Sequence, residues 1–255
     1  HSRMTGPQMA SRQTMDFRLI IFDFDGTLAD SFPFFAGVFN QLAASHGFRP
    51  IDAAEVPALR ERSPRELMEH VGMPRWKLPL VAKDFIALMR QNQHQVQLFD
   101  GVPRMLRDLA EADLQLAIVS SNAEDNVRRI LGADTAPLFA SYECGMSIFG
   151  KSSRLDKVLH KLAVPAVNAL YIGDQSTDAE AARSAGVAFA AVAWGYGTMK
   201  ALRAYQPEVE FATVADNISQ ACRIAEIIAE TEPPGSCRGL FSYCWYCLLG
   251  RPAYL

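Results

Sequence analysis

Short apolar runs recur along this chain, and stretches with helical periodicity separate them. The runs are Arg18–Asp23, Leu116–Ser120, Ala169–Gly173 and Val187–Ala193. The helical stretches are Val102–Ala112, Ala123–Leu131, Leu155–Leu162 and Thr177–Ala185. A short unbroken apolar run is typical of a parallel strand that is buried on both faces. Because strands that alternate with helices form βαβ units, the sequence predicts an α/β fold with a doubly wound parallel sheet.

The stretch between the first two runs follows another pattern. Residues 32–98 contain helical segments that glycines and prolines interrupt, and no convincing strand. Within them Ser63-Pro64-Arg65-Glu66 is typical of a helix start, with serine as the N-cap, proline at the first helical position and glutamate completing a capping box. We therefore predict a helical cap at residues 32–98, inserted into a core of residues 15–31 and 99–230. A last helix, at about 214–229, would close that core.

Both ends of the chain differ from the predicted core. Residues 1–14 are polar and aperiodic, and they resemble an expression leader. Residues 231–255 begin with the sequence Thr-Glu-Pro-Pro-Gly, which breaks a helix, and we treat them as a tail of unknown role. The tail contains Cys237, Cys244 and Cys247, which make an incomplete zinc site because no histidine lies nearby. An accessory or non-native tail is therefore favoured over a metal or redox centre.

Composition excludes several classes of protein. The formal net charge is −3, which gives no reason to expect nucleic acid or an anionic membrane as a partner. No apolar run is long enough to span a bilayer. The five cysteines do not form the even-numbered pattern of a disulfide framework, which favours a reducing cytoplasm. We expect a cytoplasmic monomer or homodimer that meets the charge of any anionic substrate locally.

Polar residues follow the predicted strands at the edge where open parallel sheets bind their ligands. They are Asp23 and Asp25 after the first run, Ser120 after the second, Lys151 in a Gly-Lys-Ser-Ser loop, and Asp174 and Asp178 after the third. Each residue taken alone has a structural explanation, such as turn formation, helix capping or solvation. Taken together, they predict one pocket with several carboxylates, a hydroxyl and an ammonium.

Such a pocket suits phosphoryl transfer. A carboxylate nucleophile divides hydrolysis into two easier displacements through an aspartyl-phosphate. Because carboxylates alone would repel a phosphate dianion, the pocket also needs a hard cation with oxygen ligands, and Mg²⁺ fits best. Lys151 would neutralise charge on the transferring oxygens, and Ser120 with neighbouring backbone N–H groups would orient them.

The same residues resemble the motifs of the haloacid dehalogenase superfamily. Asp23-x-Asp25-Gly26-Thr27-Leu28 is similar to its first motif, Ser120 to its second, Lys151 to its third, and Gly173-Asp174-x-x-x-Asp178 to its fourth. The resemblance extends from about Phe17 to Ala229, and the inserted helical region is similar to the cap of phosphoglycolate phosphatase-like members. In this family Asp23 would attack phosphorus, and Asp25 would protonate the leaving oxygen and then activate water.

The resemblance also implies the ligands of the metal and of the phosphate. Asp23, the backbone carbonyl of Asp25, and Asp174 would bind Mg²⁺, with Asp178 as a further ligand or a partner of one. Ser120 and the N–H of Ser121 would bind phosphate oxygens, and Lys151 would pair with Asp23 and the phosphate. The family commonly has Lys-Pro at the third motif, whereas this chain has Lys151-Ser152. Lys157 and Lys161 in the next helix are weaker candidates for the same role.

The expected function is Mg²⁺-dependent hydrolysis of a small-molecule phosphate monoester, with a phosphoglycolate-type substrate as the leading interpretation. The aspartate at position 25 argues against dehalogenation, which attacks carbon and needs no metal. A phosphomutase of the beta-phosphoglucomutase type keeps the same motifs and stays an alternative, as does a non-catalytic binding protein of this fold. In the cap, the candidates for contact with a second anionic group are Arg60, Arg62, Arg65, His70, Arg75 and Lys77. For Trp194 and Tyr196 we favour packing over substrate contact.

Overall fold

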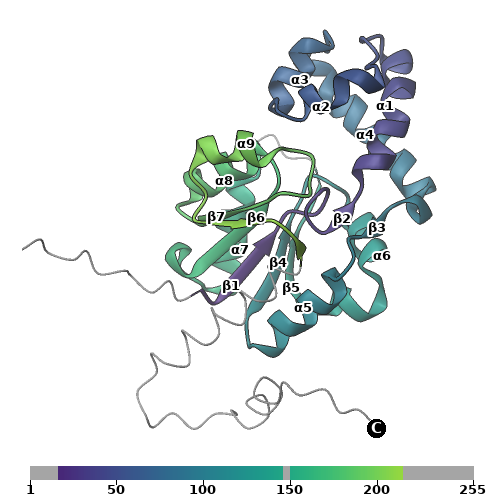
Figure 1. The fold of residues 1–255 in the computed structure, drawn as a ribbon. Coiled ribbons are helices and arrows are strands. Elements are labelled where there is room, and N and C mark those ends of the chain that lie inside the picture. The colour runs from purple at the N-terminus through teal and green to yellow at the C-terminus, as the bar shows by residue number, and fades with distance from the viewer. Residues whose placement is uncertain (1–16, 146–149, 215–255) are drawn as a thin grey trace, which may run out of the picture.

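A computed structural model describes residues 17–145 and 150–214 of the chain. Its main sheet contains six parallel strands in the order β5-β4-β1-β6-β7-β8 (Figure 1). The strands are β1 (Leu19–Phe22), β4 (Gln115–Val119), β5 (Phe139–Glu143), β6 (Ala169–Gly173), β7 (Ala188–Val192) and β8 (Val209–Phe211). The predicted α/β class and parallel sheet are confirmed.

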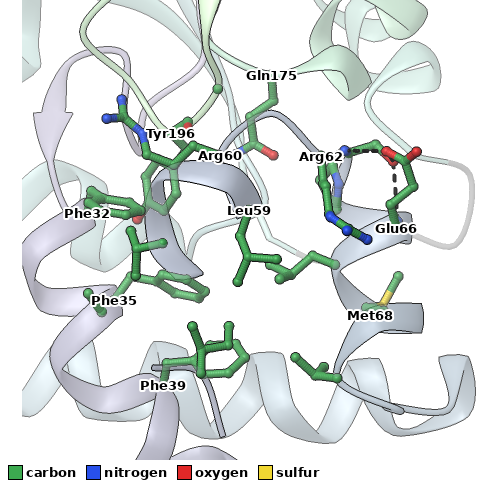
Figure 2. A pocket seen from close by; sticks show the side chains of 18 of the residues that line it. Phe32, Phe35, Phe39, Leu59, Arg60, Arg62, Glu66, Met68, Gln175 and Tyr196 are labelled. Carbon is green, nitrogen blue, oxygen red and sulfur yellow. Dashed lines mark hydrogen bonds between the residues drawn. The ribbon is translucent and has the colours of Figure 1, made fainter. Parts of the chain in front are cut away.

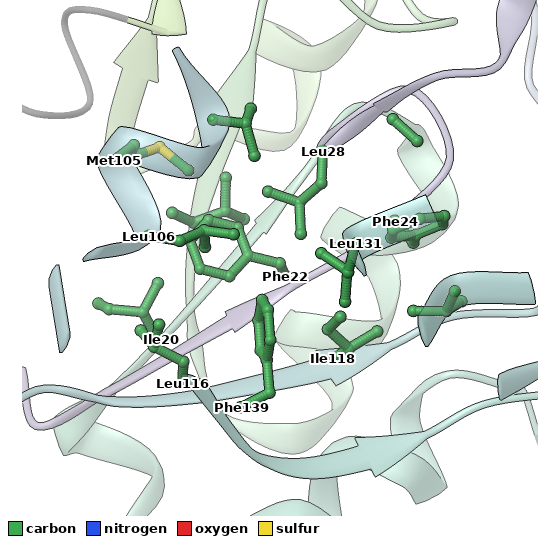
Figure 3. Packing of buried hydrophobic residues seen from close by; sticks show 14 of the residues in the cluster. Ile20, Phe22, Phe24, Leu28, Met105, Leu106, Leu116, Ile118, Leu131 and Phe139 are labelled. Carbon is green, nitrogen blue, oxygen red and sulfur yellow. The ribbon is translucent and has the colours of Figure 1, made fainter. Parts of the chain in front are cut away.

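Helices cover both faces of this sheet. Successive residues of a strand point to opposite sides, and because those of the central strands are apolar on both sides, both faces have to be buried. The helices of the core are α5 (Val102–Glu111), α6 (Glu124–Thr135), α7 (Ser152–Leu162), α8 (Ser176–Ala185) and α9 (Met199–Leu202). On one face Ile20 and Phe22 pack with Met105 and Leu106 of α5, as Figure 3 shows. On the other face the remaining residues of β1 pack with α7, α8 and α9. Burial on both sides explains why the run at β1 has no polar residue.

The apolar runs in the sequence did not predict the two edge strands, β5 and β8. Their residues alternate in burial or include exposed positions, as in Phe139-Ala-Ser-Tyr-Glu143. The four predicted strands are the central ones, which carry the longest apolar runs. An edge strand has a neighbour on one side alone, so its sequence need not be uniformly apolar.

A helical region, residues 32–95, lies beyond the carboxyl end of β1 (Figure 1). It consists of α1 (Phe32–His46), α2 (Val56–Leu59), α3 (Pro64–His70) and α4 (Leu78–Gln91), with the 3₁₀ turns η1 (Ala53–Glu55), η2 (Arg75–Lys77) and η3 (Gln93–Gln95). Its own small core includes Phe39, Leu42 and Val81. The capping box at the start of α3 is confirmed: Glu66 N–H donates to Ser63 Oγ at 3.3 Å, and Ser63 N–H donates to Glu66 Oε2 at 2.7 Å.

One short ladder joins the two connections of the helical region. β2 (Ala29–Asp30) pairs antiparallel with β3 (Gln97–Leu98). We expected no strand within residues 32–98, and β3 corrects this: its two residues form a strand because β2 lies beside them. The predicted leader at 1–14, most of the helix expected at 214–229, and the tail at 231–255 lie outside the described residues.

Candidate active site

The polar residues predicted at the strand ends lie together at one edge of the sheet. Asp23 follows β1, Ser120 follows β4, and Asp174 follows β6. β1 is in register with β4 on one side and with β6 on the other up to its last residue, Phe22. The three strands therefore end level with one another, and the residues that follow them surround one point.

Lys151 lies between two of the predicted carboxylates. Its Nζ atom is 2.9 Å from Asp23 Oδ1 and 2.6 Å from Asp178 Oδ1. The carboxylate side chains are 4% and 0% exposed, respectively. Burial alone would lower the pKa of Lys151, but Asp178 and Asp23 raise it above its usual range. The lysine therefore stays charged and neutralises part of a buried acidic cluster.

Asp178 holds this lysine through a network of its own. The hydroxyl of Tyr171 donates to Asp178 Oδ1 at 2.9 Å, and the backbone N–H of Gln175 donates to Asp178 Oδ2 at 3.0 Å. The second bond belongs to the capping box that starts α8. Both oxygens of Asp178 thus have protein partners, which fix the carboxylate and, through it, the Lys151 ammonium.

Asp174 is fully buried and is also held on both oxygens. Thr27 Oγ1 donates to Asp174 Oδ1 at 3.1 Å, and the backbone N–H of Tyr196 donates to Oδ2 at 2.6 Å. Burial, with the nearby charge of Asp178, raises the pKa of Asp174 to about 7, although these hydrogen bonds oppose the shift. An ionised Asp174 is therefore costly in this cluster unless a cation lies beside it.

Glycines make room for the Asp174 carboxylate. A Cβ atom on Gly26 or Gly195 would overlap the carboxyl group of Asp174, and one on Gly197 would overlap its backbone oxygen. Gly26 also has φ of +84°, a conformation that favours glycine. The first motif and the 195–197 segment thus both require glycine for a steric reason, and in each case that reason is Asp174, through its side chain at Gly26 and Gly195 and through its backbone oxygen at Gly197.

If the acidic cluster binds a divalent metal ion, we expect Gly195→Ala to displace the Asp174 carboxylate and to weaken that binding by about 10- to 100-fold, the range for changes next to a metal ligand. Calorimetric titration of the protein with Mg²⁺ measures this shift. Gly37→Ala is the matched control, because a Cβ atom there meets no other atom within 4 Å. An unchanged Mg²⁺ affinity in Gly195→Ala would contradict the steric argument.

Asp25 lies beside the cluster and faces Asn122. The side-chain amide of Asn122 donates to Asp25 Oδ2 at 3.0 Å. Asp25 Oδ1 is buried and has no hydrogen-bond partner in the described part of the chain. Burial raises the pKa of Asp25, which favours its protonated form. A protonated carboxyl group with a free oxygen is suited to give a proton to a bound substrate.

Ser120 is buried, and its hydroxyl accepts a hydrogen bond from the backbone N–H of Asn122 at 3.1 Å. The N-cap of α6 is Ala123, so Ser120 is not the helix cap that its sequence position also allowed. Arg154 donates to the Ser120 carbonyl at 2.6 Å and fixes this loop. Ser121 is exposed and borders the cavity described below.

Three carboxylates of the site fit a metal ion. Asp23, Asp174 and Asp178 each offer one oxygen, and these oxygens lie within 4.8 Å of one another. Burial raises the pKa of Asp23 well above its usual range; Asp178 and Asp174 raise it further, and Lys151 opposes them. Hard oxygen ligands of this kind suit Mg²⁺. The carboxyl group of Asp25 lies outside this set, and the metal contact expected of its backbone carbonyl stays a prediction.

A cavity of about 790 Å³ separates the helical region from the loops of the core. Figure 2 shows Phe35, Phe39 and Leu59 around it, with Gln175 and Tyr196 on the side of the core. Tyr196 packs edge-on against the ring of Phe35, with 5.6 Å between the ring centroids. The packing role expected of Tyr196 is therefore present, and the same side chain also lines the cavity.

Arg60 connects the helical region to the core. It donates to the carbonyl of Gly195 at 2.5 Å and to that of Tyr196 at 3.1 Å, and it lies 5.4 Å from the centroid of the Phe32 ring. The carbonyls that it binds belong to the segment whose Tyr196 N–H donates to Asp174. Arg60 thus positions residues 195–196, and the Tyr196 N–H in turn positions Asp174.

We expect Arg60→Met to lower kcat/KM by about 10- to 100-fold, because it removes two charged hydrogen bonds of about 1.5–3 kcal/mol each from a half-buried place. Lys200→Met is the control: Lys200 also reaches across, to Glu61 at 2.8 Å, but its side chain is 79% exposed. An exposed ion pair of this kind contributes little. Steady-state kinetics of both variants test this prediction. Equal losses of kcat/KM in Arg60→Met and Lys200→Met would refute the role given to Arg60.

The other basic candidates of the helical region mostly have partners there. The pairs are Arg65 with Glu69, His70 with Glu55, and Lys77 with the carbonyl of His46. Arg75 lies in η2. Arg62 lines the cavity. Within residues 17–145 and 150–214 its side chain forms no hydrogen bond or close ion pair, although, with the hydrogen bonds from Ser63, its charge helps to lower the pKa of nearby Glu66.

Several residues of the site were not predicted. Thr27, Asn122 and Tyr171 each bind one of the aspartates through a side chain. Asn122 follows the end of β4 by a few residues, and that position was the available signal. Tyr171 lies inside an apolar strand, and nothing in the residue pattern indicated that its hydroxyl would reach Asp178. Trp194, which donates to the Thr27 carbonyl at 3.0 Å and packs on Phe99, has the expected packing role.

Comparison with known proteins agrees with this arrangement. The profile of the family described as "Haloacid dehalogenase-like hydrolase" matches residues 20–192. A phosphoglycolate phosphatase of Synechococcus elongatus is 32% identical over 77% of this chain and 93% of its own length. The tyrosine-protein kinase PtkA of Mycobacterium tuberculosis is 30% identical over 71% of this chain and 63% of its own.

A solved structure shares the fold. It is that of a haloacid dehalogenase-like family hydrolase from Streptococcus pneumoniae, with a TM-score of 0.68 and 19% identity over 80% of this chain and 98% of that one. Among the described residues, no helix is long and apolar enough to cross a membrane.

Proposed function

Because this chain is a phosphatase that belongs to the haloacid dehalogenase-like hydrolase family, we propose that it hydrolyses small-molecule phosphate monoesters through an aspartyl-phosphate on Asp23, with Mg²⁺ as cofactor. One observation supports this most directly. Asp23 Oδ1 lies 2.9 Å from the partly buried ammonium of Lys151, and Asp23 lies next to two further carboxylates, at an edge where three strands end. A nucleophile, a cation and metal ligands are thus within reach of one phosphate.

The proposed reaction has two steps. In the first, an oxygen of Asp23 attacks phosphorus, the bond between phosphorus and the ester oxygen breaks, and Asp25 gives its proton to the leaving alcohol. In the second, Asp25 takes a proton from water, the water oxygen attacks the same phosphorus, and Asp23 leaves with inorganic phosphate as the product. The raised pKa of Asp25 suits the first step.

Other residues bind the phosphate and the metal. We assign the phosphate oxygens to the Ser120 hydroxyl, the Ser121 N–H and the Lys151 ammonium. Asp23, Asp174 and the backbone carbonyl of Asp25 would hold Mg²⁺, with Asp178 as a ligand or as the partner that fixes Lys151. When bound, Mg²⁺ supplies positive charge opposite the phosphate oxygens.

The helical region acts in this proposal as a cap, residues 32–98, over a core of residues 15–31 and 99–230. Phosphoglycolate is the first substrate to test, since a relative named for this activity is 32% identical. Its carboxylate would meet Arg62, which lines the cavity beside the site. Action in the cytoplasm as a monomer or homodimer stays a prediction.

Release of phosphate from phosphoglycolate and from p-nitrophenyl phosphate, with Mg²⁺ and with EDTA, tests the proposal. We expect turnover with Mg²⁺ and its loss in EDTA, with recovery when Mg²⁺ is added back. Hexose 1-phosphate should yield free phosphate or nothing, and formation of an isomeric hexose phosphate would instead identify a mutase. No phosphate release from any ester in Mg²⁺ would reject the proposed function.

A further inference from the structure

The cavity beside the site is bounded mainly by apolar side chains. Figure 2 shows Phe35, Phe39, Leu59 and Met68 around it, which come from α1, α2 and α3. Its volume of about 790 Å³ falls within the range of about 300–1,000 Å³ that is usual for pockets binding drug-sized ligands. The two-carbon group of phosphoglycolate would occupy a small part of it.

This cavity borders the edge of the core at which we propose that the phosphate binds. Ser121 and Gln175 line it, and they directly follow Ser120 and Asp174 in the chain. A phosphate bound at Ser120 and Lys151 would therefore direct its organic group toward the apolar side chains.

Few charges remain available in the cavity for a polar ligand. Four lining residues are charged: Arg60, Glu61, Arg62 and Glu66. Arg60 is bound to two backbone carbonyls, Glu61 to a lysine, and Glu66 to the N-terminus of α3. Within the described residues, Arg62 alone among the four lacks a hydrogen-bond or ion-pair partner. A large polar or polyanionic organic group would thus leave most of its polar atoms unpaired.

We propose, on the basis of the phosphatase function proposed above, that this cavity binds the organic group of the substrate and that the enzyme also hydrolyses phosphate monoesters of apolar alcohols, such as medium-chain alkyl phosphates. Each methylene that enters the cavity leaves water, and this should raise kcat/KM about three- to fourfold. The increase should stop when the chain fills the cavity.

The test uses the unmodified protein with a series of butyl, hexyl and octyl phosphate, each below its critical micelle concentration, and with phosphoglycolate for comparison. We expect kcat/KM to increase with chain length. Binding of the corresponding alkylphosphonates, measured by calorimetry, should follow the same order, and it does not depend on turnover.

Two leucine variants locate the effect. Leu59→Asn places an amide in the cavity and should reduce the increase of kcat/KM with alkyl chain length. Leu80→Asn makes the same change on α4 at a leucine that is 51% exposed and does not line the cavity, so the dependence should persist. Arg62→Gln should lower kcat/KM for phosphoglycolate more than for octyl phosphate.

The outcomes separate the two proposals. Turnover of phosphoglycolate without any dependence on alkyl chain length overturns this inference and leaves the phosphatase function in place. Tighter binding of longer phosphonates without turnover of any ester supports the cavity assignment and rejects the phosphatase function. Equal behaviour of the two leucine variants would show that the longer chains bind elsewhere, and would overturn the inference.

Discussion

Asp23→Asn should reduce phosphatase activity by at least about 10³-fold, because an amide cannot attack phosphorus and a nucleophile acts as a unit with its partners. Its fold should survive. Lys151 keeps Asp178 at 2.6 Å, and burial had already raised the pKa of Asp23, so its charge was costly to the folded protein. We expect no aspartyl-phosphate by intact-protein mass spectrometry after acid quench, and no loss in unfolding free energy.

Asp113→Asn is the control for this substitution. Asp113 is exposed, and its φ of 62° is a conformation that asparagine also adopts readily. Its activity should match that of the unmodified protein. Hydrolysis of p-nitrophenyl phosphate by Asp23→Asn at an undiminished rate in Mg²⁺ would show that another residue is the nucleophile.

Lys151→Met should have the largest effect on stability. It leaves Asp23 and Asp178 buried without their cation, and breaking a buried pair in this way costs about 3–5 kcal/mol. Activity should also be lost, because the phosphate loses its ammonium partner. Lys157→Met, at an exposed position in α7, the helix that Lys151 precedes, should change the unfolding free energy by less than about 0.5 kcal/mol. Urea unfolding in EDTA measures the unfolding free energies of the two variants and of the unmodified protein.

The stability loss in Lys151→Met should depend on pH in a definite direction. Burial raises the pKa of Asp23, and Lys151 opposes that rise, so its removal leaves the pKa of Asp23 higher still. A carboxyl group whose pKa is higher in the folded than in the unfolded state makes the protein less stable as pH rises from the unfolded-state pKa to the folded-state pKa. The difference from the unmodified protein should therefore be smaller at pH 5 than at pH 8. A difference that is independent of pH would mean that lost packing, and not charge, causes the destabilisation.

The sequence predicted the centre of the fold better than its edges. The four central strands have unbroken apolar runs because helices cover both of their faces, whereas β5 and β8 lie at the edges and carry mixed residues. The short ladder of β2 and β3 gave no signal, because two residues are too few to show a period. Pairing across about 70 residues is a property of the folded chain and not of either segment.

The acidic residues and the lysine were recognisable because each follows a strand or opens a helix, and strand ends converge in a parallel sheet. What orients them was not recognisable. Tyr171 lies within a run that reads as uniformly apolar, and Arg60 lies far from Tyr196 in sequence yet binds its carbonyl at 3.1 Å. Such contacts depend on the exact crossing of elements, which residue type and spacing do not encode.

The ladder of β2 and β3 has a consequence for how this molecule can change. The chain leaves the core at Ala29–Asp30 and returns at Gln97–Leu98, and these points are neighbours. A helical region of a different size could be inserted between these two points, and the course of the chain within the core would stay the same. If the helical region acts as the proposed cap, it could therefore be exchanged for another, and substrate preference could change without a change in the residues of the core site. A transplanted helical region would also have to replace the contacts that the present one makes with the core, such as those of Arg60 with the 195–196 carbonyls and that of the Ile86 carbonyl with Asn126.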